Sequence, residues 1–328
     1  MRAAGRALPP GLLPLRGWGL LALIFLAAVP AAARGYGGAR PFEMLFLDAG
    51  AAQGALGGAF GAGADDPNVL AYNPAGLASL DSVRAAFMHT AHFQDVAREH
   101  LALAGPGWGT SVDYLKYGAI RRRTLSNPDG AGLGAFSPYA LSAAAGLGFP
   151  VTDSIMLGGA VRHTREALDG SVGSAFSADV GAQMILSDEP LLRLGVTLQN
   201  AGPDVRFGTS EEALPVNLRW SGALGFGMLG RPWVLLGDVN HDETGRMVVQ
   251  GGATTPLNDV IALRLGYNGR NDAGLGLTAG FGVEWGALSV DYAIAPYGAL
   301  GMGHQLSLGW NFGREEVRPV LPQPRLRK

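Results

Sequence analysis

Eight charged residues between positions 162 and 291 have the types and the spacing to do chemistry together. Four are arginines and four are carboxylates: Arg162, Asp179, Arg193, Arg219, Asp238, Arg264, Glu284 and Asp291. Guanidinium and carboxylate groups either pair through charge-assisted hydrogen bonds or line a path for a charged substrate. Because the two signs balance, we favour pairs between neighbouring strands, and the substrate path is the alternative.

Other groupings that could support catalysis are weaker. His89 and His92 lie three residues apart, which on a strand places them on opposite faces, so we do not expect them to share a metal ion. Residues 274–279 imitate the glycine pattern of a dinucleotide-binding loop, but no helix pattern follows them. Asp65 and Asp66 favour a turn over a calcium site. The sequence therefore predicts no enzyme, no cofactor and no metal site.

The composition excludes several classes of protein. There is no cysteine, which excludes a disulfide scaffold, a thiol nucleophile and a Cys-based metal site. The formal net charge of −2 gives no electrostatic footprint for nucleic acid. Charged residues make up 16% of the chain, against about 25% in a soluble domain, and the 51 glycines among 328 residues are about twice the usual share. Such a composition is unlike that of a typical cytosolic enzyme.

The first 33 residues have the pattern of a secretory signal peptide. Arginines precede an apolar run at residues 18–29, and alanines at 31–33 fit a cleavage site. An uncleaved membrane anchor is the alternative, but a helix of this length spans about 18 Å, which is short for a hydrocarbon core of about 30 Å. We therefore predict an exported protein that is cleaved before Arg34.

From about residue 82 the dominant pattern is strict alternation, the period of a β-strand. In residues 288–296, for example, Val290 and Tyr292 lie on an apolar face, and Asp291 lies on the opposite face. Fourteen segments show the pattern: 82–93, 97–106, 107–117, 137–148, 152–163, 174–186, 190–200, 216–228, 231–241, 246–254, 258–268, 273–285, 286–296 and 302–313. An even number of strands of about ten residues is typical of a closed, antiparallel outer-membrane barrel. The fold class is thus an all-β, 14-stranded transmembrane barrel over residues 82–313.

The faces and the connections agree with such a barrel. The apolar faces would contact lipid, and the eight charges would face the lumen, because Arg or Lys at the bilayer midplane costs about 2–4 kcal/mol. The longest connections, at residues 118–136, 165–172 and 201–215, all follow odd strands and are predicted to be exterior loops. A soluble β-sandwich or lipocalin-like barrel is the alternative, but one core layer cannot absorb the apolar faces of so many strands.

Residues 34–81 do not alternate and are rich in glycine. Glycine at such density suits close approach of one backbone to another. The stretch ends in the motif Asn73, Pro74, Ala75, Gly76 and Leu77. We predict that the segment folds into the lumen as a hatch, with the motif as its candidate binding element. The motif as a helix-start turn without a ligand role is the alternative.

The stretch at residues 46–80, FLDAGAAQGALGGAFGAGADDPNVLAYNPAGLASL, resembles the opening signature of PorV/PorQ outer-membrane proteins, which belong with the FadL-like barrels. The resemblance extends over residues 42–313, through LQNAG at 198–202, LRLGY at 263–267 and the last two strands. It implies a 14-stranded barrel in the outer membrane of a Gram-negative-type bacterium, with an N-terminal hatch in the lumen. A departure is the basic, proline-rich tail at residues 314–328, which we predict to be a periplasmic extension.

The resemblance implies two functions. PorV/PorQ proteins include components of type IX secretion that bind the C-terminal signals of cargo proteins, which predicts secretion-system and cargo partners. A FadL-like channel would instead bind a hydrophobic small molecule in the lumen. A structural role in the membrane is a third option, and in each case the barrel would contact outer-membrane lipid and no nucleic acid.

Overall fold

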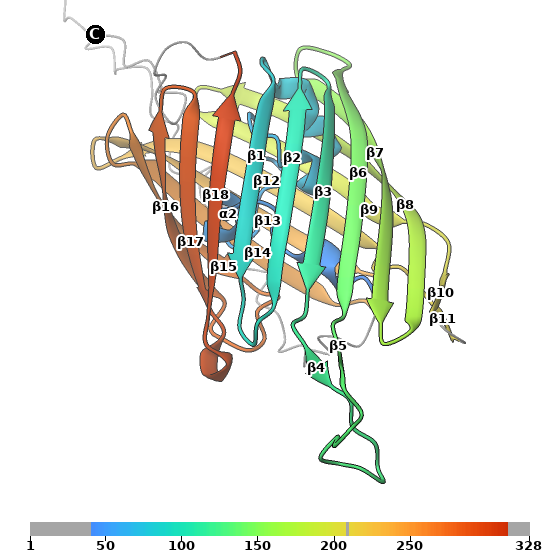
Figure 1. Ribbon diagram of the computed structural model, residues 1–328. Coiled ribbons are helices and arrows are strands. Elements are labelled where there is room, and N and C mark those ends of the chain that lie inside the picture. The colour runs from blue at the N-terminus through green and yellow to red at the C-terminus, as the bar shows by residue number, and fades with distance from the viewer. Residues whose placement is uncertain (1–40, 208–209, 314–328) are drawn as a thin grey trace, which may run out of the picture. The chain divides into compact units, whose positions relative to one another are not determined.

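Fourteen strands pair into a closed antiparallel barrel, which confirms the fold class expected from the alternation (Figure 1). The structure, a computed structural model, describes residues 41–207 and 210–313. The predicted signal peptide (1–33), the first residues of the predicted hatch (34–40) and the predicted tail (314–328) lie outside the described residues.

The barrel strands differ in length from one side of the barrel to the other. In chain order they are β1 (Arg84–Ala91), β2 (Ala97–Gly105), β3 (Trp108–Lys116), β6 (Tyr139–Pro150), β7 (Ile155–Leu168), β8 (Ser171–Asp188), β9 (Leu191–Ala201), β12 (Asn217–Met228), β13 (Arg231–Asp242), β14 (Met247–Pro256), β15 (Ile261–Asn268), β16 (Leu277–Trp285), β17 (Leu288–Pro296) and β18 (Met302–Asn311). Each strand pairs with the next, and the β1–β18 pair closes the sheet, with Arg84 opposite Asn311 and Ala91 opposite His304. Closure leaves no unpaired edge strand, as a sheet within a bilayer requires.

Each predicted segment overlaps one strand, but two details of the prediction are wrong. Residues 165–172 are not a long loop: β7 and β8 continue until Leu168 pairs with Ser171, which leaves a two-residue turn at Asp169 and Gly170. Charged and small residues in this stretch interrupt the alternation of apolar and polar side chains that identifies a strand. Leu275, within the predicted strand segment 273–285, lies in the connection before β16, because Gly276 takes a φ of 74° that ends the extended run.

Side-chain burial alternates along the strands as the sequence predicts. On β3, for example, Trp108, Val112 and Tyr114 are exposed, whereas Ser111 and Asp113 are buried. The exposed face carries apolar and aromatic side chains around the barrel, and the buried face carries polar, charged or small ones. This arrangement is the reverse of that in a soluble domain and matches a barrel that faces lipid.

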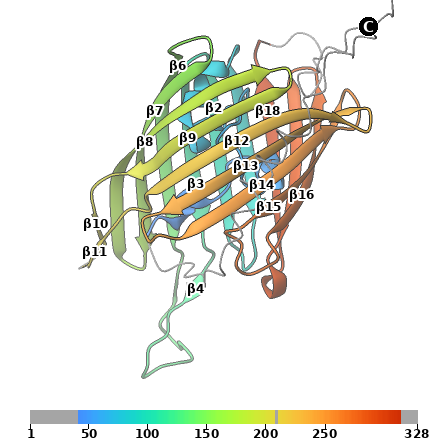
Figure 2. The same cartoon turned by 180° about the vertical axis from the view of Figure 1, so that it is seen from behind.

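Two extensions protrude from the end of the barrel that carries the longer connections (Figures 1 and 2). One is the hairpin of β4 (Ile120–Arg121) and β5 (Ala135–Phe136), and the other contains β10 (Val205–Phe207) and β11 (Ser210–Glu212). The short helix η3 (Gly298–Leu300) lies in the β17–β18 connection. Both extensions follow odd barrel strands, as expected for two of the three predicted loops.

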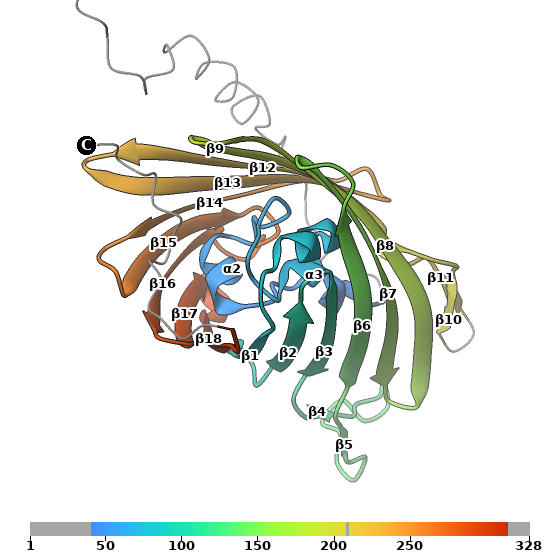
Figure 3. The ribbon, with the colours of Figure 1, turned by 90° about the horizontal axis from the view of Figure 1, so that it is seen from above.

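Residues 41–81, which we call the inner segment, lie inside the barrel (Figure 3). Four short helices build it: η1 (Glu43–Phe46), α2 (Ala51–Ala55), α3 (Val69–Tyr72) and η2 (Pro74–Ser79). Helix α2 packs against β15–β18, and η2 packs against β6–β8. None of the helices in the described part of the chain is long and apolar enough to cross a membrane.

Candidate functional site: the lumen and the inner segment

Asn73 fixes the direction of the inner segment at the start of η2. Its backbone is extended, with φ −158° and ψ 108°, as a residue before proline prefers, and its Oδ1 accepts a hydrogen bond from the Ala75 N–H at 3.1 Å. Its Nδ2 donates to the carbonyl oxygens of Gly61 and of Ala182 on β8, each at 3.1 Å. Asn73 therefore caps η2 and also ties it to the barrel wall.

The rest of the predicted motif is buried against β6 and β7. Pro74, Ala75, Gly76 and Leu77 are all buried. The approach is so close that a Cβ at Gly158 on β7 would overlap the backbone of Pro74 and Ala75. The motif is thus an anchored helix start, and a ligand role for it stays a prediction.

Three pairs form among the eight predicted lumen charges. Arg162 Nη2 lies 3.2 Å from Asp179 Oδ2, Arg219 Nη1 lies 3.0 Å from Asp238 Oδ2, and Arg264 Nη1 lies 2.7 Å from Asp291 Oδ1. The first two pairs join neighbouring strands, β7 to β8 and β12 to β13. These four residues follow the predicted pairing between neighbouring strands, whereas Arg264 and Asp291 pair across an intervening strand.

Asp238 also holds the inner segment. Besides Arg219, its Oδ2 accepts hydrogen bonds from the backbone N–H groups of Phe60, at 3.0 Å, and Gly61, at 3.1 Å. The Arg219 guanidinium in turn lies 5.2 Å from the centre of the Tyr72 ring, within cation–π range. The pair thus joins two barrel strands to two parts of the inner segment.

The Arg264–Asp291 pair reaches over an intervening strand. Arg264 lies on β15 and Asp291 on β17, and Gly282 of β16 lies between them. A Cβ at Gly282 would overlap both Asp291 Oδ1 and the Arg264 guanidinium. The missing side chain therefore makes this ion pair possible.

The other two predicted charges are placed differently. Arg193 on β9 is half-buried within electrostatic reach of Asp65, and its Nε has no hydrogen-bond partner among the described residues. Glu284 on β16 lines a cavity beside the inner segment. Neither joins the three ion pairs above.

A second charged network, absent from the sequence prediction, lies on β2 and β3. Arg98 donates to Asp113 and, at 2.6 Å, to the carbonyl of Asp48 in the inner segment. His100 contacts Asp113 through Nδ1 at 2.8 Å and Asn68 of the inner segment through Nε2 at 3.0 Å. The same period of two that identified the other charges could have found these residues.

Amide side chains form a ladder across β9, β12, β13 and β14. Asn217 Nδ2 donates to Gln199 Oε1 and Asn240 Oδ1, and Asn240 Nδ2 donates to Gln250 Oε1, each at 2.9 Å. Gln250 Nε2 continues the ladder to the carbonyl of Gly57 in the inner segment, at 2.8 Å. Because each amide both donates and accepts, the ladder satisfies polar groups that the lumen buries.

Cavities of different size lie beside the inner segment, and two of them are described by their lining. The smaller, of about 20 Å³, lies among Arg98, Arg162, Arg219 and Asp48 and has room for one water molecule. Burial of Asp48 raises the pKa of its carboxyl to about 6, and the nearby arginines partly oppose this shift. The larger cavity, of about 130 Å³, lies next to β15–β18 and β1.

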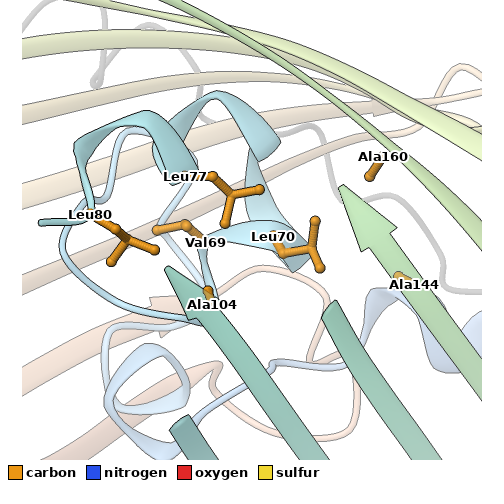
Figure 4. Close-up of a cluster of buried hydrophobic side chains, with 7 residues drawn as sticks. All are labelled: Val69, Leu70, Leu77, Leu80, Ala104, Ala144 and Ala160. Carbon is orange, nitrogen blue, oxygen red and sulfur yellow. The ribbon is translucent and has the colours of Figure 1, made fainter. Parts of the chain in front are cut away.

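An apolar cluster joins the inner segment to β2, β6 and β7 (Figure 4). Its members are Val69, Leu70, Leu77 and Leu80 of the inner segment and Ala104, Ala144 and Ala160 of the wall. The wall supplies only small side chains, so the leucines fill the space between the two surfaces. Apolar packing therefore holds the inner segment to the wall, in addition to the hydrogen bonds and ion pairs described above.

The N-terminal third of the chain matches a family model. Residues 26–135 match an uncharacterised protein family, UPF0164. The match includes the inner segment and the first three barrel strands. No curated protein matches the sequence.

Solved structures of similar fold cover most of the chain. The CymD monoaromatic hydrocarbon channel has a TM-score of 0.56 at 11% identity, and the alignment covers 82% of this chain and 99% of the CymD chain. The Ralstonia pickettii toluene transporter TbuX has a TM-score of 0.55 at 13% identity, covering 81% and 98%. The Pseudomonas putida toluene transporter TodX has a TM-score of 0.52 at 13% identity, covering 81% and 99%. At these identities the likeness is one of fold.

Proposed function

We propose that this protein is an outer-membrane channel for small hydrophobic molecules and that the inner segment closes it in the form described above. The apolar outer face and the closed sheet support a membrane location. The names of the matched barrels support the substrate class, since they are a monoaromatic hydrocarbon channel and two toluene transporters.

The observation that carries the proposal is the apolar cluster of Figure 4. Leu70 and Leu77 fill space against a wall of alanines, and each is at most 1% exposed. If the inner segment moved away, this apolar surface would be open to a hydrocarbon. A hydrophobic solute could then replace the leucine side chains, because transfer of apolar surface out of water is favourable.

We do not propose the protein-cargo function that the PorV/PorQ resemblance implies. The names of the matched barrels refer to hydrocarbons. In addition, the inner segment and the polar side chains that hold it fill the lumen. A structural role without transport is an outcome of the test below.

A disulfide lock tests the gate. Ala55 of α2 packs against Ala293 of β17, and the native chain has no cysteine, so Ala55→Cys with Ala293→Cys gives a single possible cross-link. The variant is expressed in cells whose lipopolysaccharide-rich outer membrane is a barrier to toluene, and uptake of labelled toluene is measured. Uptake should occur in the reduced form and be lost after oxidation, with a non-reducing gel reporting the cross-link.

The single variant Ala55→Cys is the matched control and should transport equally with or without oxidant. Equal uptake by the oxidised and reduced double variant, with the cross-link formed, would mean that the inner segment is not the gate. No toluene uptake by the unmodified protein would favour the structural role.

A further inference from the structure

The larger cavity separates part of the inner segment from the barrel wall. Gln53, Asp65, Asp66 and Asn68 line it on the inner side, and β15–β18 and β1 line it on the outer side. Its volume of about 130 Å³ is close to the roughly 150 Å³ of an engineered cavity that binds benzene. It therefore has room for one molecule of about six non-hydrogen atoms.

The side chains around this cavity carry an excess of negative charge. Asp65, Asp66, Glu284 and Asp291 line it together with two cations, Arg84 and Arg264. Arg264 is held by Asp291, as described above. Arg84 donates to Asp81, outside the cavity, at 3.0 Å, and to the backbone carbonyl of Asp65. Both guanidinium groups are thus already engaged, and Arg193, which is outside the lining but within electrostatic reach of Asp65, offsets only part of the negative charge, so the cavity favours a cation.

Gln53 independently indicates that the cavity suits a polar ligand. Its side chain lines the cavity, and the residue is only 1% exposed. Neither Nε2 nor Oε1 of its amide has a hydrogen-bond partner among the described residues. Because buried amides are normally hydrogen-bonded, this amide has the capacity to bind a polar group inside the cavity.

The lining also favours an organic cation over a bare metal ion. Ala52, Pro67 and Ala86 contribute apolar surface to the cavity. Among the described residues, no group of three His, Asp or Glu side chains is arranged to hold a metal ion. A ligand with a small hydrocarbon body and a positively charged hydrogen-bond donor can contact both the apolar residues and the carboxylates of this lining.

We propose that this cavity binds a small organic ammonium ion. The ammonium group lies among Asp65, Asp66 and the Oε1 atom of Gln53, and the hydrocarbon body contacts the small apolar residues. Binding at this site does not require transport, so the inference stands or falls separately from the channel function.

Three probes that share a cyclopentyl ring and differ in charge test the inference on the full chain in detergent micelles, and the decisive comparison is between the ammonium and the alcohol, which have the same number of non-hydrogen atoms. Calorimetry compares cyclopentylammonium, cyclopentanol and cyclopentanecarboxylate. Cyclopentylammonium should bind at least about tenfold more tightly than cyclopentanol, and the carboxylate should bind most weakly. Equal affinity for the three, or no binding of the ammonium, would overturn the inference, and this comparison needs no variant.

Two variants locate the site. Asp65→Asn should weaken cyclopentylammonium binding about fivefold and leave cyclopentanol binding unchanged, whereas Asp153→Asn, in the exposed turn after β6, should change neither. Gln53→Leu should also weaken ammonium binding while raising the thermal midpoint, because it removes an unpaired buried amide. Full ammonium affinity in both cavity variants would place the ligand elsewhere and overturn the inference, as would equal competition by potassium ions.

Discussion

Besides its contacts with β2, β3, β6 and β7, the inner segment meets two walls of unlike chemistry. Toward β8, β9 and β12–β14, which we call the amide wall, long polar side chains reach its backbone: Gln183 donates to the carbonyls of Gly61 and Gly63, and Gln250 to that of Gly57. Toward β15–β18, the small-residue wall, the contacts are short: Ser307 Oγ accepts from the Ala51 N–H at 2.8 Å, and Thr278 Oγ1 donates to the Ala55 carbonyl at 3.0 Å.

The unlike contacts indicate which side of the inner segment can move. Backbone carbonyls held by buried amides and ion pairs are costly to release, because each partner left behind is buried and unsatisfied. The small-residue wall has fewer such ties, and the cavity of about 130 Å³ lies beside it. We therefore expect the inner segment to pivot on the amide wall, to separate first from β15–β18 and only then from the apolar cluster on β2, β6 and β7.

Removal of most of the inner segment abolishes its contacts with both walls. Of the changes considered, this one should have the largest effect, and the effect should be on conductance through the lumen. A chain that lacks residues 50–77 should still insert, because the strands carry the lipid-facing surface, and its lumen should be open to ions. In planar bilayers the intact protein should be nearly closed and the deletion should conduct in clear steps. Identical conductance would show that the segment does not occlude the lumen, and failure to insert would make it part of the folding core.

The two walls can be compared by one substitution in each. Asp238→Ala removes the acceptor of Arg219 and of two backbone N–H groups in a buried place, and should destabilise the protein by about 3–5 kcal/mol. Ser307→Ala removes a single hydrogen bond and should cost about 1 kcal/mol. Urea unfolding in micelles measures both, and a larger cost for Ser307→Ala would reverse the assignment of the anchored side.

The ion pair that crosses β16 depends on a glycine. Gly282→Ala places a methyl group in the space occupied by Asp291 and Arg264, and should cost about 2–3 kcal/mol through overpacking. Gly227→Ala on β12 is the control, since a Cβ there meets nothing within 4 Å. Thermal midpoints should fall only for Gly282→Ala, and equal midpoints would mean that the pair is easily rearranged.

The smallest expected effect is a pH dependence at Asp48. Its pKa is about 6 in the folded chain against an ordinary value of 3.8, so the folded state binds the proton more tightly. Protonated Asp48 therefore contributes to the free energy of unfolding. This contribution is fully present below about pH 4 and is lost as the pH rises through 6. Neutral Asp48→Asn should be the more stable protein at pH 7 by about 1–2 kcal/mol, allowing for water entry, and this advantage should fade toward pH 4.5. A difference that does not vary with pH would contradict a buried, ionised Asp48.

Strands and facing could be predicted because they are local properties. A period of two places every second side chain on the same face, so Val290, Tyr292 and Asp291 are assigned without knowledge of any partner. The prediction failed at residues 165–172, where the strands extend through charged and small residues and the apolar signal is lost. It also did not include Arg98, His100 and Asp113, although these residues follow the same alternation on β2 and β3.

By itself, the sequence determined the number of strands, their apolar outer face and the presence of a glycine-rich segment before them, since each depends on residues close together in the chain. Tertiary structure alone decided which partners the lumen residues take. Arg264 reaches Asp291 over Gly282, Gln250 reaches Gly57, and Gln53 is left unpaired beside a cavity, because these contacts depend on the barrel's register and on how the inner segment folds back into it. Partners so far apart in sequence leave no local pattern from which they could be predicted.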